Sequence, residues 1–248
     1  MDDPQLIAGL TGLFLLMALL YSAVGQGGGS GYLGAMALLG VAPDRFRLIA
    51  LTLNVVVASI GWVKFTRAGY FDGRLLLPFV VSSVPLAFLG GYFSLPPGIF
   101  RPLVGGVLLW AAVLLIWKPP VPRGEGKGKA PLVGSLVAGG GIGLLSGLIG
   151  IGGGIFLAPL LILRGWASAK TTACLSSGFI LVNSLAALGG LSFHTQEVPR
   201  FLPIWMVVVA VGGWIGSEAG ARRLSPKTLH WLLAGVLVIA GARIVLLG

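Results

Sequence analysis

The chain has 248 residues, of which 56% are hydrophobic and only 10% are charged, and its mean hydropathy is +0.98. Soluble domains carry about a quarter charged residues, so this composition excludes an ordinary soluble protein and predicts a polytopic membrane protein. The net charge of +10 does not indicate nucleic-acid binding, because the basic residues lie at the ends of apolar segments, as cytoplasmic loops require. The single cysteine, Cys174, excludes an intrachain disulfide and a multi-cysteine metal site.

Ten apolar segments are predicted to be helices. In chain order they are 6–24, 28–40, 46–64, 75–93, 99–117, 132–149, 153–164, 172–190, 201–217 and 229–247. Segments 28–40 and 153–164 are too short to cross, since about 12 residues at ~1.5 Å each span ~20 Å of a ~30 Å hydrocarbon core. Each is therefore predicted to be a half-helix that begins near the bilayer midplane. Their length alone leaves open whether they are re-entrant or belong to full crossings.

The chain divides into two halves that are predicted to be repeats. Residues 118–131 are polar and rich in Pro and Gly, which is typical of a linker, so we expect membrane repeats at 1–117 and 132–248. The glycine runs recur at an offset of 125 positions, and Asn54 pairs with Asn183 at an offset of 129. Landmarks that agree in order along both halves indicate an internal duplication.

The distribution of basic residues favours repeats of opposite orientation. If each half crosses an odd number of times and the N-terminus is outside, 12 Lys and Arg residues face the cytoplasm and 5 face outside; parallel repeats give at best 9 and 8. The positive-inside rule therefore favours two inverted five-segment repeats in an all-α polytopic inner-membrane protein. Both termini are then expected outside, and the linker 118–131 is expected in the cytoplasm.

Two glycine runs, 25–29 and 150–154, interrupt the apolar pattern at corresponding places. Irregular backbone at membrane depth needs protein or a polar cavity to satisfy it, and a helix N-terminus that follows such a break suits an anion. We therefore predict backbone contacts to an anion from Gly27, Gly28, Gly29, Gly152, Gly153 and Gly154, with the Ser30 hydroxyl as a further donor. The alternative is that these glycines only allow close helix packing.

Polar residues in the third and eighth segments form a second group of candidates. Thr52 and Asn54 lie in the third segment, and Ser176, Ser177 and Asn183 lie in the eighth. Polar side chains at this depth must find partners, so we expect them to line the substrate cavity. The alternative is hydrogen bonding between helices.

Enzyme chemistry is not predicted. The apolar segments contain no carboxylate pair, HExxH motif, metal-ligand cluster or Ser/His/Asp arrangement, so we expect no catalytic residue, metal or cofactor. Glu218 comes closest to the interior of a span, but Arg222 lies four residues further on and predicts a surface ion pair. Coupling through a buried carboxylate is therefore unsupported, and co-transport of a proton on the substrate, or no coupling, stays open.

The two glycine-rich segments, 25–34 and 150–161, resemble the sulfite exporter TauE/SafE family, also called the toluene-sulfonate uptake permease family. The stretches 67–72 and 224–229 extend the resemblance, which covers nearly the whole chain. It implies a polytopic inner-membrane permease for small sulfur-containing anions such as sulfite, sulfonates, sulfoacetate or thiosulfate. Members differ in substrate and direction, so neither transfers to this chain.

The two copies of the glycine-rich segment are not equivalent. Gln26 stands where the second copy has Ile151, and Gly34 stands where it has Pro159, so contact with substrate is expected to be unequal. The prediction is a permease that works by alternating access, with a small anion and the lipid bilayer as partners. The alternatives are an anion channel on the same scaffold, a permease for another small solute, or a membrane assembly factor. A homodimer is common for small permeases, and the oligomeric state stays open.

Overall fold

The computed structural model describes residues 3–41, 45–93, 130–194 and 198–223, together with residues 98, 99, 102, 106, 113, 231 and 238. Its helices are α1 (Pro4–Ala23), α2 (Gly29–Leu38), α3 (Phe46–Arg67), α4 (Gly73–Tyr92), α6 (Leu132–Ile149), α7 (Gly154–Leu163), α8 (Ala169–Leu191) and α9 (Leu202–Glu218), followed by the π-helical turn η2 (Ala219–Arg223). The predicted segments 99–117 and 229–247 and most of the linker 118–131 lie outside the described residues.

Six of the described helices are long and apolar enough to cross a membrane. They are α1, α3, α4, α6, α8 and the continuous stretch Leu202–Arg223. Helices α2 and α7 have 10 residues each, which is ~15 Å or about half of a hydrocarbon core. The protein is therefore an all-helical, multi-pass membrane protein over the described residues. Helix α8 begins three residues before its predicted start, because the Ser168 side chain accepts a hydrogen bond from the Thr171 N–H at 3.2 Å and caps it.

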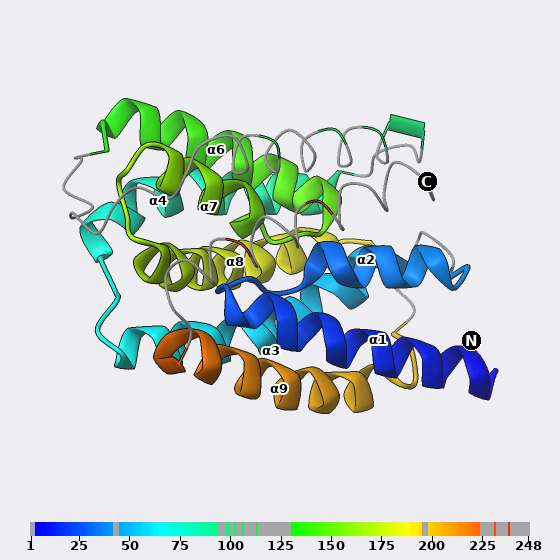
Figure 1. Cartoon of the computed structure of the whole chain (residues 1–248). Helices are drawn as coiled ribbons and strands as arrows, with labels where there is room; N and C mark the ends of the chain where they lie inside the picture. Colours follow the sequence, from blue (N-terminus) through cyan, green and yellow to red (C-terminus); the bar gives the residue numbers. More distant parts are fainter. Residues whose placement is uncertain are drawn as a thin grey trace.

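The long helices run in two opposite directions (Figure 1). Helices α1, α3 and α9 run one way, and α4, α6 and α8 run the other. Helices α3 and α8 pack against each other; α9 packs on α3 and α1, while α4 packs on α8 and α6. The short helices lie beside them, α2 against α1 and α3, and α7 against α8 and α6. All of these contacts between long helices join one half of the chain to the other.

Two glycine stripes bring pairs of helices into backbone contact. One stripe on α6 consists of Gly139, Gly143 and Gly147, and the other on α9 and η2 consists of Gly212, Gly216 and Gly220. A methyl group added to each glycine of the α6 stripe would meet the α4 backbone, at Phe79, Ser83 and Ala87 in turn. A methyl group added to each glycine of the other stripe would meet the α1 backbone, at Leu15, Leu19 and Ala23 in turn. Small residues at a spacing of four allow this close approach in membranes, where packing must replace the hydrophobic effect.

One end of α3 is held by the half-buried side chain of Arg47. The Arg47 guanidinium donates hydrogen bonds to the carbonyl oxygens of Gly90 (2.8 Å), Gly91 (2.7 Å) and Phe93 (2.8 Å) on α4, and of Gly147 (2.9 Å) on α6. The last carbonyls of a helix have no intrahelical partner and carry partial negative charge, so a cation there is stabilising. Arg47 therefore ties the first turn of α3 to the ends of two other helices.

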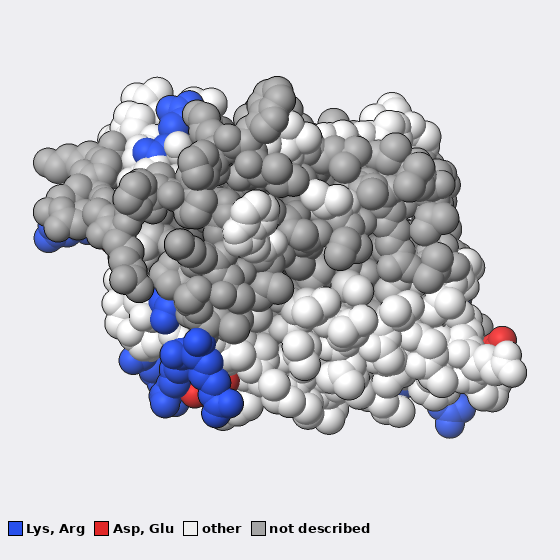
Figure 2. All heavy atoms as spheres, in the orientation of Figure 1, with Lys and Arg blue, Asp and Glu red and all other residues white. Residues whose placement is uncertain are grey.

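Lys and Arg residues gather at the opposite end of α3 (Figure 2). There the last turns of α3 and η2 lie beside the start of α4 and α8. The described basic residues at this end are Lys64, Arg67, Arg74, Arg164, Lys170, Arg222 and Arg223, whereas Arg45, Arg47 and Arg200 belong to the other end. Lys64 forms an ion pair with Glu218 and lies 3.6 Å from the centroid of the Trp214 ring. Glu218 also pairs with Arg222 at 3.0 Å, which confirms the predicted ion pair.

Replacing Lys64 should destabilise the protein more than replacing Arg222. The Lys64 side chain is 12% exposed and joins α3 to α9, whereas the Arg222 side chain is 71% exposed and pairs within its own turn. Exposed ion pairs contribute little because water and salt screen them. We expect Lys64→Met to lower the melting temperature in detergent, and Arg222→Met to leave it nearly unchanged. Equal shifts for both variants would contradict this assignment.

Candidate anion site between two glycine loops

Each short helix follows a loop in which some positions have backbone angles that only glycine adopts without strain. The first glycine loop (residues 24–28) joins α1 to α2, and the second glycine loop (residues 150–153) joins α6 to α7. Gly25 has φ +73° and Gly150 has φ +87°, both in the left-handed region, where a side chain would be strained. The Gly150 N–H donates to the Ser146 carbonyl at 2.8 Å, so a glycine C-cap ends α6 and allows the chain to turn back.

The two glycine loops lie against each other although they come from different halves. Gln26 Nε2 donates to the Gly154 carbonyl at 3.2 Å, and Asn54 Nδ2 donates to the Ile151 carbonyl at 3.0 Å. A methyl group on Gly29 would lie 3.0 Å from the Ile151 carbonyl oxygen. The N-terminal ends of α2 and α7 are therefore brought together in the interior.

Asn54 and Ile180 hold equivalent places around the two loops. A methyl group on Gly27, Gly29 or Gly152 would come within 3.0 Å of the Asn54 side chain. Ile180 is the central residue of the 23-residue α8. It contacts Gly152, Gly154 and Gly27, so it makes with the second loop the contacts that Asn54 makes with the first, and the reverse. The offset between Asn54 and Ile180 is 126 positions. These contacts place the midpoint of α8, and hence the loops, deep in the apolar region.

Asn183, which matches Asn54 in the sequence, is not among the nearest neighbours of the loop glycines. Asn183 lies almost one turn beyond Ile180, and its Nδ2 donates to the Phe179 carbonyl of its own helix at 2.8 Å. The offset of 129 positions comes from matching two asparagines in the sequence. The residues of α3 and α8 that make corresponding contacts with the loop glycines, Asn54 and Ile180, are 126 positions apart. An isoleucine therefore faces the loops in the second half where the first half has an amide.

The remaining predicted residues contact the loops to different degrees. Ser177 Oγ donates to the Gly25 carbonyl at 3.0 Å and so joins α8 to the first glycine loop. Ser30 Oγ donates to the Tyr21 hydroxyl at 3.0 Å, which holds it toward α1. Ser176 is fully buried and Thr52 half-buried, and neither is among the closest neighbours of the loop glycines.

Eight buried side-chain oxygens lack a hydrogen-bond partner among the described residues, and four of them belong to residues beside the loop glycines. A methyl group on Gly27 would lie 2.5 Å from Asn54 Oδ1, one on Gly28 would lie 2.7 Å from the Tyr32 hydroxyl, and one on Gly152 would lie 2.9 Å from Ser184 Oγ. The Cβ atom of Ser146 would lie 3.2 Å from a methyl group on Gly153. All four residues, Tyr32, Asn54, Ser146 and Ser184, are 0% exposed, and none of these oxygens has a hydrogen-bond partner among the described residues. Such groups require an explanation, such as a ligand or water.

Tyr32, Ser146 and Ser184 are absent from the residues predicted to form the site. Tyr32 lies four residues after Gly28, and Ser146 lies four residues before Gly150, so both are one helical turn from a loop. This spacing of one helical turn from a glycine run could have identified Tyr32 and Ser146 in the sequence.

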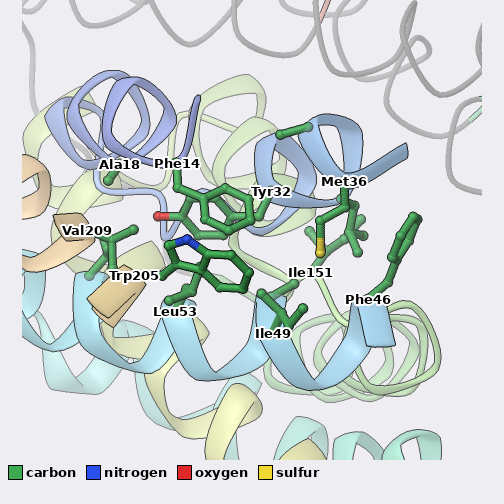
Figure 3. Close-up of a cluster of buried hydrophobic side chains, with 14 of the residues drawn as sticks. Phe14, Ala18, Tyr32, Met36, Phe46, Ile49, Leu53, Ile151, Trp205 and Val209 are labelled. Carbon is green, nitrogen blue, oxygen red and sulfur yellow. The ribbon is translucent and has the colours of Figure 1, made fainter. Parts of the chain in front are cut away.

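The loops rest on an apolar cluster that separates them from the surroundings (Figure 3). The Tyr32 ring packs edge-on against Phe14 with centroids 5.3 Å apart, and Phe14 packs in the same way against Trp205 at 5.3 Å. Leu53 of α3 and Ile151 of the second glycine loop complete this cluster. Water-poor surroundings strengthen hydrogen bonds to any group held at the loops. In the part of the chain that the structure describes, no three His, Cys, Asp or Glu residues gather as metal ligands.

Six long apolar helices, two half-length helices and paired glycine breaks between them are features of a membrane transporter. The chain matches the model of the family described as "Sulfite exporter TauE/SafE" over residues 10–244, and it therefore belongs to that family of membrane transporters. It is 37% identical over 247 residues to the "Probable membrane transporter protein y4hK" of Sinorhizobium fredii (strain NBRC 101917 / NGR234), covering 95% of this chain and 97% of that protein. No solved structure matches the chain.

Proposed function

We propose that the protein is an inner-membrane permease that moves a small sulfur-containing anion of the sulfite, sulfonate, sulfoacetate or thiosulfate class by alternating access. The anion binds between the two glycine loops, where the N–H groups that begin α2 and α7 converge. The observation that carries this proposal is the set of buried, unpartnered oxygens at Gly27, Gly28, Gly152 and Gly153. Helix N-termini with partial positive charge supply the attraction, since none of the described basic side chains is among the nearest neighbours of the glycines at 27–29 and 152–154.

Two inverted repeats, 1–117 and 132–248, joined by a cytoplasmic linker, account for the packing of the described helices. Exchanging α1 with α6, α2 with α7, α3 with α8 and α4 with α9 turns each major helix contact into another observed one, and the exchanged helices run in opposite directions (Figure 1). The shared contacts of Asn54 and Ile180 support the same symmetry. Such repeats can rock against each other around a fixed central site.

The charge distribution supports an orientation. The end of the molecule with Lys64, Arg67 and Arg222 carries more of the described Lys and Arg residues than the other end (Figure 2). By the positive-inside rule this end faces the cytoplasm, which leaves the N-terminus outside.

Counterflow separates the permease from an anion channel on the same scaffold. Proteoliposomes are preloaded with unlabelled sulfite, thiosulfate, sulfoacetate or taurine, and uptake of the same labelled compound is followed, with acetate and chloride as controls. We expect transient accumulation of label above equilibrium for at least one sulfur anion, with a flux that saturates at millimolar concentration. Flux without counterflow and without saturation would favour the channel. Transport of acetate or chloride in preference to every sulfur anion would overturn the substrate class.

A further inference from the structure

The orientation of the Asn54 amide follows from its partner. Asn54 Nδ2 lies 3.0 Å from the Ile151 carbonyl oxygen, which can only accept a hydrogen bond, so the amide NH₂ must face it. The Oδ1 atom consequently faces Gly27, where a methyl group would come within 2.5 Å of it. Asn54 is 0% exposed, and Oδ1 has no donor among the residues that the structure describes.

Asn54 Oδ1 differs in kind from the other polar groups of the site. The hydroxyl groups of Tyr32, Ser146 and Ser184 and the N–H groups at the helix starts can all donate to the oxygens of an anion. An amide oxygen can only accept. A ligand whose exposed atoms are all acceptors would leave Oδ1 buried without a partner and place negative charge near its partial negative charge, both of which cost free energy.

We propose that the site selects anions that also carry a hydrogen-bond donor, an O–H or N–H group, which Asn54 Oδ1 accepts. The class comprises hydroxyl- or amino-substituted alkylsulfonates and singly protonated oxyanions. This inference rests on the proposed function, because it assumes that the anion lies between the glycine loops. The donor is recognised on one side of the site only, since Ile180 stands in the equivalent position of the second half and has no polar atom.

Two ligands of matched size and charge test the inference in the intact protein. 2-Hydroxyethanesulfonate and propane-1-sulfonate differ by an O–H in place of a methyl group. Isothermal titration of the wild type in detergent should give about 10-fold tighter binding of the hydroxyl compound, as expected for one buried hydrogen bond. Equal affinities, or tighter binding of propane-1-sulfonate, would overturn the inference and leave the proposed function standing. Binding of neither sulfonate would also overturn the inference, and the proposed function would fall with it only if sulfite and thiosulfate failed to bind as well.

Two variants assign the selectivity to Asn54. In Asn54→Leu the preference for the hydroxyl compound should fall to about 2-fold or less, because the acceptor is gone. Asn183→Leu is the matched control, since Asn183 is also fully buried and its Oδ1 also lacks a partner among the described residues. Unlike Asn54, it is not among the nearest neighbours of the loop glycines, and its Nδ2 donates within its own helix. This control variant should keep the 10-fold ratio, whatever it does to absolute affinity. A ratio that persists in Asn54→Leu would overturn the inference, and the wild-type comparison remains decisive if that variant does not fold.

Discussion

Replacing Gly152 with alanine is expected to lower substrate transport about 100-fold. Gly152 has φ +83°, which costs about 1 kcal/mol for alanine. The new methyl group would also lie 2.7 Å from Ile180 Cγ2, 2.9 Å from Ser184 Oγ and 3.0 Å from Asn54 Nδ2. Displacing tightly packed groups typically costs about 1–3 kcal/mol, and two of the displaced groups belong to Asn54 and Ser184, which are proposed to line the anion site. The measurement is initial uptake into proteoliposomes at a fixed protein content.

Gly69→Ala is the matched control for this variant. Gly69 has φ +85°, so it carries the same backbone strain, but no heavy atom lies within 4 Å of its added methyl group. We expect Gly69→Ala to transport at close to the wild-type rate. If both variants lost transport equally, backbone strain alone would explain the loss and the crowding argument would fail.

Replacing Gly147 with alanine should destabilise the membrane domain by about 3 kcal/mol or more. Its methyl group would overlap the Ala87 carbonyl oxygen of α4 and crowd the Gly91 backbone nitrogen, so α4 and α6 would have to separate. Backbone atoms cannot move aside as a flexible side chain can, and interiors are close-packed. The shift would also disturb the Arg47 hydrogen bond to the Gly147 carbonyl. Thermal unfolding in detergent measures the effect.

Gly141→Ala on the same helix tests whether helix propensity alone is responsible. Gly141 is exposed and has no heavy atom within 4 Å of an added methyl group. Alanine is intrinsically better than glycine in a helix by about 1 kcal/mol, so this variant should be as stable as the wild type or slightly more stable. A similar loss of stability in both variants would contradict the role given to the glycine stripe.

The described helices could be predicted from the sequence because a helix that crosses a membrane must be apolar along its whole length, so each apolar run gives the length of a helix. The predicted segments 28–40 and 153–164 correspond to α2 and α7, and glycine runs precede both. Helix packing was less accessible. The glycines of the α6 stripe are spaced four apart within a longer glycine-rich stretch, so composition did not distinguish those that touch α4 from Gly141, which faces outward.

The candidate site could be predicted at the level of the loops, but only in part at the level of the side chains, since Asn54 and Ser177 were predicted and contact the loops whereas Tyr32 and Ser184 were not predicted. The glycine runs at 25–29 and 150–154 are visible in the sequence, and the structure brings them together. Matching identical residues selected Asn183, whereas Ile180 is the residue of α8 whose contacts with the loop glycines mirror those of Asn54. An isoleucine and an asparagine share no sequence similarity, so the match of identical residues could not find this correspondence.

A structure of the protein with a bound sulfonate would test the central claim most directly. The crystals or particles would be prepared with 2-hydroxyethanesulfonate, which carries the hydroxyl donor that the Asn54 Oδ1 atom is proposed to accept. The account predicts the sulfonate between Gly27–Gly29 and Gly152–Gly154, within hydrogen-bond distance of N–H groups from both glycine loops and close to Asn54. A sulfonate bound elsewhere, with the two glycine loops packed together as they are here, would show that these glycines serve helix packing and not anion binding.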